Sequence, residues 1–452
     1  MSVAEWQKVK FGKNTSYELL HTVKRNLQKQ SMTPRQRLIC TLNHQQVDRV
    51  CVDFGAGGQT GIGAGAVSKL RKALLGVNGF RVKIIEPYQM LGEIDAELHK
   101  ALGLDVLGIS TRCNMFGFTN ENWKPFEMND GTPVLVPGDF NYTVTEDGDT
   151  LMYPLGDTTA QPCAKMPKTG YFFDALNRQK PLDECILNPE DNCEEFSVLS
   201  QTDLDYYAHT AKKLYNETDC GIYMTIGGAA FGDVALVPAT WMKDPKGIRD
   251  VEEWYVSTVL RADYVYKVFE KQCEIALKNI ELLAKAVGDM VQVVFVSGTD
   301  FGHQRGLFAS PETYRRLYKP FQKQVNDKIH QLTNWKIFIH SCGAVSELIP
   351  DLIDAGFDIL NPVQLSAQGM DPVKLKREFG RHITFWGGGV DTQKTLPFGT
   401  PQEVYREVYE RLGILSRGSG YVFNGTHNIQ SDVPVENILA MFKALHDFNS
   451  KA

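Results

Sequence analysis

The stretch WKIFIHSCGAVSELIPDLIDAGFDILN, residues 335–361, contains the unit that decides the fold. Residues 336–339 form a short apolar run, residues 345–354 alternate apolar and polar side chains at helical spacing, and residues 358–360 form a second apolar run. An uninterrupted apolar run is typical of a strand in a parallel sheet that is covered on both faces. A strand, a helix and another strand in this order predict one β-α-β unit with parallel strands.

The same alternation recurs along most of the chain. The runs that we expect to be strands lie at 49–54, 105–109, 222–226, 291–296, 336–339, 358–360, 383–385 and 421–423. The helical patterns lie at 254–287, 310–332, 345–354, 371–379, 401–415 and 434–447. Together they predict an α/β fold of the (β/α)8 TIM-barrel type, with residues 1–452 in a single barrel domain. An open, doubly wound sheet is the alternative.

Two segments depart from this alternation. Residues 1–45 are expected to form an N-terminal helical extension, in which Thr33-Pro34-Arg35-Gln36 has the pattern of a capping box with proline in the first turn. Thr400-Pro401-Gln402-Glu403 repeats that pattern. Residues 112–200 are rich in Gly, Asp, Asn, Pro and aromatic residues, with hairpin turn signals at 129–132 and 146–149. They predict an antiparallel β insertion after the second strand, placed over the barrel mouth.

The composition favours a globular enzyme with a large core. Hydrophobic residues make up 43% of the 452 residues and charged residues 23%. The net charge of −6 argues against nucleic acid as a partner, because nucleic-acid-binding surfaces are basic. We find neither a secretory signal nor a run of about 18 apolar residues, so no membrane association is expected. The nine cysteines are scattered and predict reduced thiols in a cytoplasmic protein.

Metal-binding side chains follow the end of the fifth predicted strand. In a parallel barrel, the loops after the carboxyl ends of the strands build the active site. His340-Ser341-Cys342-Gly343 lies at such an end, and imidazole and thiolate are the ligands that Zn²⁺ prefers. The spacing alone is more often incidental, but its position leads us to predict that His340 and Cys342 bind zinc at the barrel mouth.

Other candidate residues come from neighbouring strand ends. Asp300 is predicted to donate a proton or to orient a ligand. The residues expected to contact the substrate are Gln304, Gln364, Asp391 and Asn424. Asp391 could instead accept a hydrogen bond from a metal-bound imidazole. Glu86, just before Pro87, is a weaker candidate for the pocket wall. For each of them, the ordinary alternative is a side chain that caps a loop or faces solvent.

Several motifs resemble those of the uroporphyrinogen decarboxylase superfamily. They are Thr33-Pro34-Arg35-Gln36-Arg37-Leu38 with Val47-Asp48-Arg49-Val50, Ser310-Pro311-Glu312-Thr313-Tyr314-Arg315 with Lys319-Pro320, His340-Ser341-Cys342-Gly343, and Asp432-Val433-Pro434-Val435-Glu436-Asn437-Ile438. The resemblance spans about residues 32–110 and 220–447 and leaves the predicted insertion poorly matched. It implies a barrel with its active site at the mouth.

Within this superfamily the sequence looks like a corrinoid-dependent methyltransferase rather than a decarboxylase. The loop Gly55-Ala56-Gly57-Gly58-Gln59-Thr60-Gly61 offers no arginine to hold porphyrinogen carboxylates. The His-x-Cys pair is similar to the zinc motif of the methyltransferases, whose third ligand is a cysteine near the last strand. His427 stands where that cysteine would fall. The resemblance therefore implies His340, Cys342 and His427 as ligands, and the departure at His427 leaves the third ligand open.

This ligand set leads to a hypothesis for the reaction. Two imidazoles and one thiolate carry less negative charge than a thiolate-rich site, which favours polarisation of an ether oxygen. We expect a methyl group to move from an O-methyl donor, such as an aromatic methyl ether, to a corrinoid (cobalamin). Because the chain lacks the Asp-x-His-x-x-Gly signature, the corrinoid is expected on a partner protein. The alternatives are transfer from a methylcorrinoid to a thiol, and a non-catalytic barrel that binds a tetrapyrrole or corrinoid.

Overall fold

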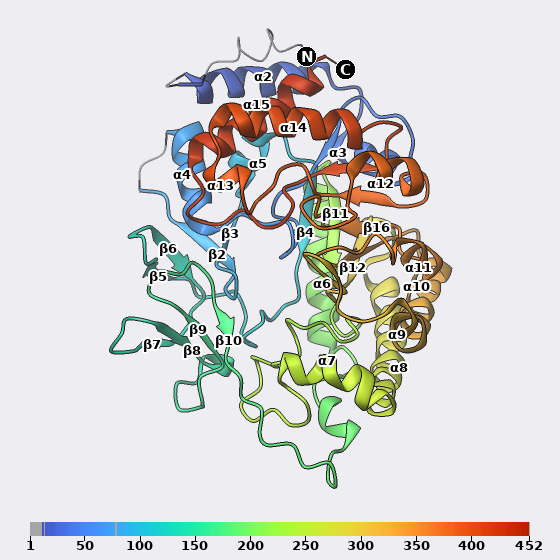
Figure 1. Ribbon diagram of the computed structural model, residues 1–452. Helices are drawn as coiled ribbons and strands as arrows, with labels where there is room; N and C mark the ends of the chain where they lie inside the picture. Colours follow the sequence, from blue (N-terminus) through green and yellow to red (C-terminus); the bar gives the residue numbers. More distant parts are fainter. Residues whose placement is uncertain (1–10, 13, 77–78, 452) are drawn as a thin grey trace.

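The computed structural model describes residues 11–12, 14–76 and 79–451, and its central feature is a parallel sheet of eight strands (Figure 1). In chain order these are β1 Cys51–Val52, β4 Val106–Ile109, β11 Gly221–Thr225, β12 Val293–Ser297, β15 Lys336–His340, β16 Ile359–Asn361, β17 Thr384–Trp386 and β18 Tyr421–Phe423. All the predicted strands are present, with ends within two residues of those expected. The prediction of a (β/α)8 barrel is confirmed.

The sheet closes on itself, which distinguishes a barrel from an open sheet. β1 pairs with β18 in parallel, so the first and last strands are neighbours. On the other side of β1, the N–H of Asp105 donates to the carbonyl oxygen of Val52 over 2.9 Å. A Cβ on Gly108 of β4 would fall 1.7 Å from the carbonyl oxygen of Ala56, so the chain after β1 runs directly against β4. The doubly wound alternative is wrong.

Helices surround the barrel (Figure 1). They are α4 Ala64–Leu75, α5 Ala96–Leu102, α6 Gln201–Glu217, α7 Val251–Leu260, α8 Ala262–Val287, α9 Pro311–Thr313, α10 Lys319–Leu332, α11 Ile349–Asp354, α12 Pro372–Phe379, α13 Thr395–Phe398, α14 Pro401–Leu415 and α15 Val435–Asn449. A π-helical turn, Tyr314–Tyr318, joins α9 to α10. Both predicted capping boxes are present, at Thr33 and at Thr400. The sequence did not single out α4, which begins after Gly63 without a side-chain cap.

Two N-terminal helices precede the barrel: α2 Thr15–Lys29 packs against surrounding helices, and α3 Pro34–Leu42 packs against the amino end of the strands. Leu38 and Leu42 of α3 belong to the same buried cluster as Tyr223 and Phe338 of the barrel interior, so α3 plugs that end. α2 lies along α15, where the Asn26 side-chain amide donates to the His446 carbonyl oxygen over 2.9 Å. Residues 1–10 of the expected extension lie outside the described residues.

The predicted insertion is a β structure beside the barrel mouth (Figure 1). Its strands are β5 Lys124–Glu127, β6 Pro133–Val136, β7 Tyr142–Val144, β8 Thr150–Met152, β9 Ala164–Met166 and β10 Asp174–Ala175. Hairpins join β5 to β6 and β7 to β8 at the two predicted turns. β2 Val82–Glu86 and β3 Leu91–Gly92 extend one of the two sheets, and β2 pairs with β6 in parallel. The β1–β4 connection therefore ties the insertion to the barrel.

All nine cysteines are free thiols, as expected from their scattered positions. Within the described residues, no helix has both the length and the apolar character needed to cross a lipid bilayer.

Candidate metal centre

His340 is the last residue of β15, and its ring is held in one orientation. The side chain is 6% exposed, and its Nδ1 lies 2.6 Å from Oδ1 of Asn361 on the adjacent strand β16. The Asn361 amide is itself oriented, because its Nδ2 donates to the Trp386 carbonyl oxygen over 2.9 Å. Nδ1 of His340 therefore donates to Asn361, and this assignment leaves the Nε2 lone pair free. Burial lowers the pKa of His340 to about 4, so the imidazole is neutral at physiological pH.

Cys342 points its thiol at the free nitrogen of His340. Sγ lies 3.3 Å from His340 Nε2. The backbone N–H of Cys342 donates to Asp300 Oδ1 over 2.7 Å, which fixes the loop after β15 to the loop after β12. Burial, followed by the nearby Asp300 carboxylate, raises the pKa of Cys342 well above its usual value. A bound divalent cation would reverse this preference and release the thiol proton.

Gly343 explains why the metal-binding loop turns so sharply. Its φ of +90° is a conformation that residues with a Cβ rarely adopt. A Cβ here would lie 2.3 Å from the carbonyl carbon of Gly302. Gly302 belongs to the short hairpin of β13 Gly302–His303 and β14 Gly306–Leu307, which follows β12. The glycine thus lets two loops pack against each other directly and keeps Cys342 beside His340.

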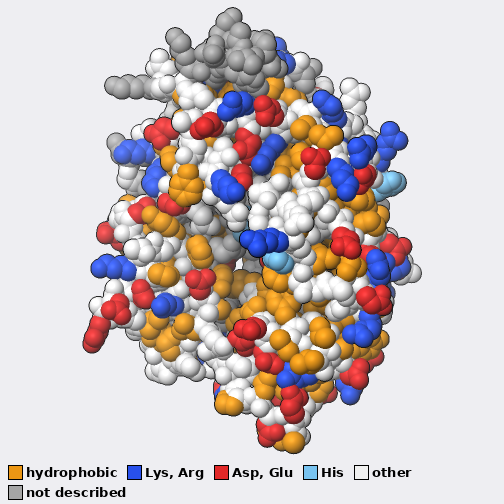
Figure 2. Space-filling view, in the orientation of Figure 1, with side chains coloured by type: hydrophobic (Ala, Val, Ile, Leu, Met, Phe, Trp, Pro, Cys, Tyr) orange, Lys and Arg blue, Asp and Glu red, His pale blue; other side chains and the backbone are white. Residues whose placement is uncertain are grey.

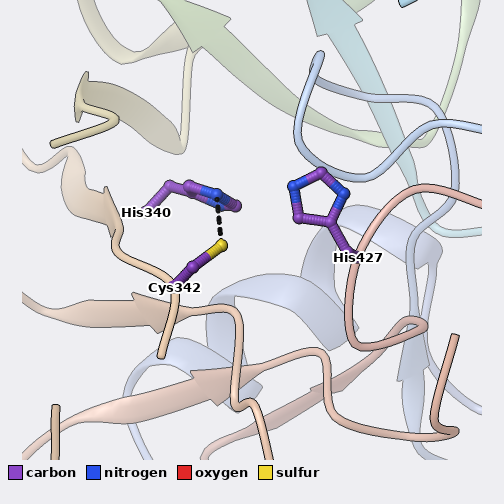
Figure 3. A group of neighbouring side chains, drawn as sticks. All are labelled: His340, Cys342 and His427. Carbon is purple, nitrogen blue, oxygen red and sulfur yellow. Dashed lines mark hydrogen bonds between the residues drawn. The ribbon is translucent and has the colours of Figure 1, made fainter. Parts of the chain in front are cut away.

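His427 approaches the pair from the loop after β18, on the opposite side of the mouth (Figure 3). The His340 and His427 rings have centroids 5.3 Å apart and meet edge to face. One ligand atom from each of His340, Cys342 and His427 can be chosen so that all lie within 4.8 Å of one another. Burial lowers the pKa of His427 to about 4, and the neighbouring His340 adds to that effect. The structure therefore brings the three predicted ligands together.

The donor set and its spacing fit a zinc ion. In a tetrahedral zinc site, metal–nitrogen bonds of about 2.0–2.1 Å and a metal–sulfur bond of about 2.3 Å place neighbouring ligand atoms roughly 3.3–3.6 Å apart. The His340–Cys342 pair already has this separation, at 3.3 Å. The widest separation in the set would contract by about 1 Å. Three protein ligands leave one tetrahedral position free, the arrangement that catalytic rather than structural zinc sites use.

Asp300 lies against this group but does not belong to it. Its Oδ1 accepts the Cys342 N–H, and its side chain lines the same cavity as His340 and His427. Burial raises the pKa of Asp300, while its hydrogen bond to Cys342 and the charge of His427 oppose the rise. A carboxyl group in this position can hold a proton next to the metal ligands, and its role as a proton donor stays a prediction.

The four residues predicted to contact the substrate make hydrogen bonds within the protein instead. Gln364 accepts the Gly343 N–H over 2.8 Å and donates to Gln304 over 3.0 Å. Asn424 donates to the carbonyl oxygen of Asp53 over 2.7 Å. Asp391 accepts backbone N–H groups of the turn that follows it. None of the four lines the cavity that contains the two histidines, so their role in substrate binding stays a prediction.

One cavity of about 440 Å³ opens onto the metal-binding group. Figure 2 shows that this face of the molecule is hollowed near its middle. One part of its wall comes from the end of β2 and the turn after it, with Glu86 and Tyr88, and from the insertion, with Phe172 and Phe173. The loop after β11 adds Asp233. The insertion therefore contributes residues to the cavity that opens onto the metal-binding group.

Comparison with known proteins identifies the family. Residues 184–448, more than half of the chain, match the family model described as uroporphyrinogen decarboxylase (URO-D). The chain belongs to the uroporphyrinogen decarboxylase family. The match includes the 220–447 segment expected from the motifs, whereas the 32–110 segment lies outside it.

Two individual proteins show how far the family likeness extends. A uroporphyrinogen decarboxylase from Pseudoalteromonas translucida (strain TAC 125) is 30% identical over 96 residues, 19% of this chain and 26% of that protein. The chain thus spans about a quarter of the length of the curated relative that it matches. A methyltransferase from Methanosarcina mazei superposes with a TM-score of 0.52 over 92% of this chain and 99% of the other, at 16% identity. This second likeness shows that the two proteins share a fold.

Sequence reasoning missed two contributions to the site of this uroporphyrinogen decarboxylase family member. Asn361 was given no role, although it is a polar residue at a strand end and pairs in register with His340. The contact between Asn361 and His340 could have been predicted from the strand order, because adjacent parallel strands bring their last residues together. Asp233 gave no signal, since it lies in an irregular connection that only tertiary packing directs into the cavity.

Proposed function

We propose that this protein is a zinc-dependent methyltransferase that moves a methyl group from an O-methyl donor, an aryl methyl ether, to a corrinoid on a partner protein. The observation that carries the proposal is the convergence of His340, Cys342 and His427 at the end of the barrel cavity. The fold shared with a methyltransferase from Methanosarcina mazei supports it. The family membership alone does not distinguish methyl transfer from decarboxylation.

His340, Cys342 and His427 would hold the zinc ion. When bound there, zinc supplies a Lewis acid that polarises the ether oxygen of the donor. Asn361 keeps the His340 ring in the tautomer that leaves Nε2 available, and Gly343 lets the loop place Cys342 beside it. These contacts preorganise the ligands, so little of the binding free energy is spent on ordering them.

Asp300 supplies the proton that the reaction needs. Transfer breaks the methyl carbon–oxygen bond, and the oxygen left behind takes up one proton to become a phenol. The raised pKa of Asp300 allows its carboxyl group to hold that proton at the cavity wall. The corrinoid supplies the nucleophile and accepts the methyl group. The protein side chains therefore position the donor, hold the proton and limit access of water.

The cavity walls argue against decarboxylation of a porphyrinogen. Several acidic side chains around a tetrapyrrole need cationic partners, and the described residues that line this cavity include neither lysine nor arginine. The loop after β1 contributes Gly58 and Gln59 to the cavity rather than a basic residue. A neutral or positively charged substrate suits such walls better than a polyanion.

The proposal is tested by mixing purified protein, zinc and chemically reduced cobalamin with a panel of methoxylated aromatic compounds. We expect methylcobalamin to form, followed by its absorbance spectrum, together with one equivalent of demethylated phenol. Zinc per chain should be close to one in the wild type and in His303→Ala, an exposed histidine outside the metal group. It should fall sharply in Cys342→Ala and in His427→Ala, with loss of activity of roughly a hundredfold or more.

Three outcomes would overturn the proposal in whole or in part. Stoichiometric zinc retained in His427→Ala would remove His427 from the ligand set and, with it, the reason to favour an ether donor. Methyl transfer from methylcobalamin to thiols, without any transfer from methoxylated compounds, would show that the enzyme works in the opposite half-reaction. Tight corrinoid binding without metal and without turnover would indicate a binding protein instead.

A further inference from the structure

The cavity beside the metal centre carries several carboxyl groups and no basic side chain within the described part of its lining. The acidic residues that line it are Glu86, Asp174, Asp233 and Asp300. The other polar groups of the metal-binding end are the two neutral imidazoles, with the divalent zinc ion that the proposed function places there. In a cavity of about 440 Å³, this imbalance sets the local potential regardless of the overall charge of the protein.

Glu86 lies at the end of β2, where it is half-buried. Its two carboxylate oxygens accept the backbone N–H groups of Tyr88, over 3.2 Å, and of Gln89, over 2.7 Å. No lysine or arginine among the described residues forms an ion pair with it. An amide or hydroxyl side chain could also stabilise this turn, so hydrogen bonding to the backbone does not by itself require a carboxylate. Glu86 also lines the cavity, so its carboxyl group stands where it can meet a cationic ligand.

Asp233, on another wall of the cavity, is also an acidic side chain without a basic partner among the described residues. It is 8% exposed, and its Oδ1 accepts the Ala235 N–H over 3.0 Å. Within the part of the chain that the structure describes, it makes no ion pair. Instead it lies near a second carboxyl group of the cavity, Asp300, and burial together with this neighbour makes ionisation of Asp233 costly. Two neighbouring buried acids without a cation are costly unless a ligand compensates them.

Aromatic rings occupy the remaining wall. Tyr88, Phe172 and Phe173 line the cavity on the side of the insertion, and Phe295 lines it from the barrel. Phe173 is fully buried, whereas Phe172 is 41% exposed. Tyr88 is held in place because its carbonyl oxygen and its hydroxyl accept the N–H groups of Phe173 and Ala175. Aromatic faces attract cations as well as aryl groups.

We propose that the methyl donor is a methoxylated aromatic amine, an aryl methyl ether that carries a protonated amino group. This inference rests on the proposed function, which assigns the ether oxygen to the metal centre. The aryl ring packs against Tyr88 and Phe172, and the ammonium group lies between Glu86 and Asp233. One ligand then contacts the aromatic wall with its ring, the acidic walls with its ammonium group and the metal centre with its ether oxygen.

The test uses three donors of similar size that differ in charge. These are 4-methoxyphenethylamine, 2-(4-methoxyphenyl)ethanol and 3-(4-methoxyphenyl)propionate. We expect kcat/KM for transfer to reduced cobalamin to be about tenfold or more higher for the amine than for the alcohol, and lowest for the carboxylate. The Glu86→Gln and Asp233→Asn variants should lower the ratio of amine to alcohol about fivefold or more. The matched control Glu127→Gln removes an exposed carboxyl group of β5 outside the cavity and should keep the wild-type ratio.

The outcomes separate this inference from the proposed function. Equal rates with the amine and the alcohol would overturn the inference and leave the proposed function in place. Absence of transfer from all three donors would count against the proposed function. In that case, calorimetric binding of tyramine against 2-(4-hydroxyphenyl)ethanol still decides the charge preference. Equal affinities overturn the inference, and tighter binding of tyramine that Glu86→Gln and Asp233→Asn weaken supports it.

Discussion

The charged side chains at the two ends of the barrel differ in whether they have ion-pair partners. At the amino end, Asp105 accepts hydrogen bonds from Arg37, over 2.6 Å, and from Arg49, over 2.7 Å, so each buried charge faces a partner. At the carboxyl end, Glu86 and Asp233 face a cavity without a basic partner among the described residues. The paired charges at the amino end therefore stabilise the fold, whereas the unpaired acidic groups at the carboxyl end are available to a ligand.

The largest expected effect comes from breaking the charge network at the amino end. In Asp105→Ala, the guanidinium groups of Arg37 and Arg49 stay buried without their shared carboxylate. We expect the free energy of unfolding to fall by about 3–5 kcal/mol, because removing one partner leaves uncompensated buried charge. Urea denaturation measures the loss, and zinc per folded chain should not change.

An exposed ion pair provides the control for that experiment. Asp244 pairs with Lys180 on the surface, where both side chains are well exposed. Asp244→Ala should therefore change the free energy of unfolding by less than about 1 kcal/mol. A loss of similar size in the Asp105→Ala and Asp244→Ala variants would mean that the buried network contributes no more than surface pairs do.

The next largest effect is expected at the mouth, in Gly343→Ala. The new methyl group meets the Gly302 backbone at 2.3 Å and forces a positive φ on a residue with a Cβ. We expect a loss of about 2–3 kcal/mol in stability together with weaker zinc binding, because the loop that carries Cys342 must move away from the hairpin that contains Gly302. Gly413→Ala is the matched control, since a Cβ there has open space within α14 and should be neutral or slightly stabilising. An unchanged zinc affinity in Gly343→Ala would show that the close approach of the loops does not position the thiol.

The same contrast explains what could be predicted from the sequence. Apolar runs such as 336–339 and helical spacing such as 401–415 are local patterns, so the strands and most helices were predictable. His340 and Cys342 are two residues apart, so their convergence was predictable too. Gln364 donates a hydrogen bond to Gln304 and accepts one from the Gly343 N–H, and both bonds depend on packing between loops. Local spacing contains no information about which loops meet.

Asn361 illustrates a contact that only the strand register reveals, and its replacement should have a moderate effect. In Asn361→Ala, Nδ1 of His340 loses its acceptor, so the ring is free to rotate and to change tautomer. We expect zinc affinity to fall by about 10–100-fold, as for other residues that orient a metal-bound histidine. Chelator competition measures the affinity. Asn361→Asp keeps an acceptor and should recover most of it, whereas the exposed control Asn334→Ala should bind zinc as the wild type does. Equal affinities for Asn361→Ala and wild type would contradict this role.

The smallest expected effect is a difference between the two ends of the barrel in how their charged groups make the stability depend on pH. Burial raises the pKa values of Glu86 and Asp233 to about 7, so the folded protein keeps these protons at a pH where the unfolded chain has lost them. Their contribution to stability is therefore fully present below pH 4 and declines as the pH rises towards 7. At the amino end, burial would raise the pKa of Asp48, but its hydrogen bonds and ion pair with Arg37 lower it, so that contribution is lost only in acid.

Unfolding free energies between pH 5 and pH 7.5 distinguish these signs. After screening by solvent in the cavity, each raised carboxyl group should account for a decline of about 1 kcal/mol across this window. Asp233→Asn and Glu86→Gln should flatten the decline, because an amide does not titrate. Asp48→Asn should lower stability by a nearly constant amount across the same window, since Asp48 is ionised in both states throughout it. If the unfolding free energy of the Glu86→Gln and Asp233→Asn double variant still declines with rising pH, other groups are responsible. The electrostatic contrast between the mouth and the amino end of the barrel would then be lost.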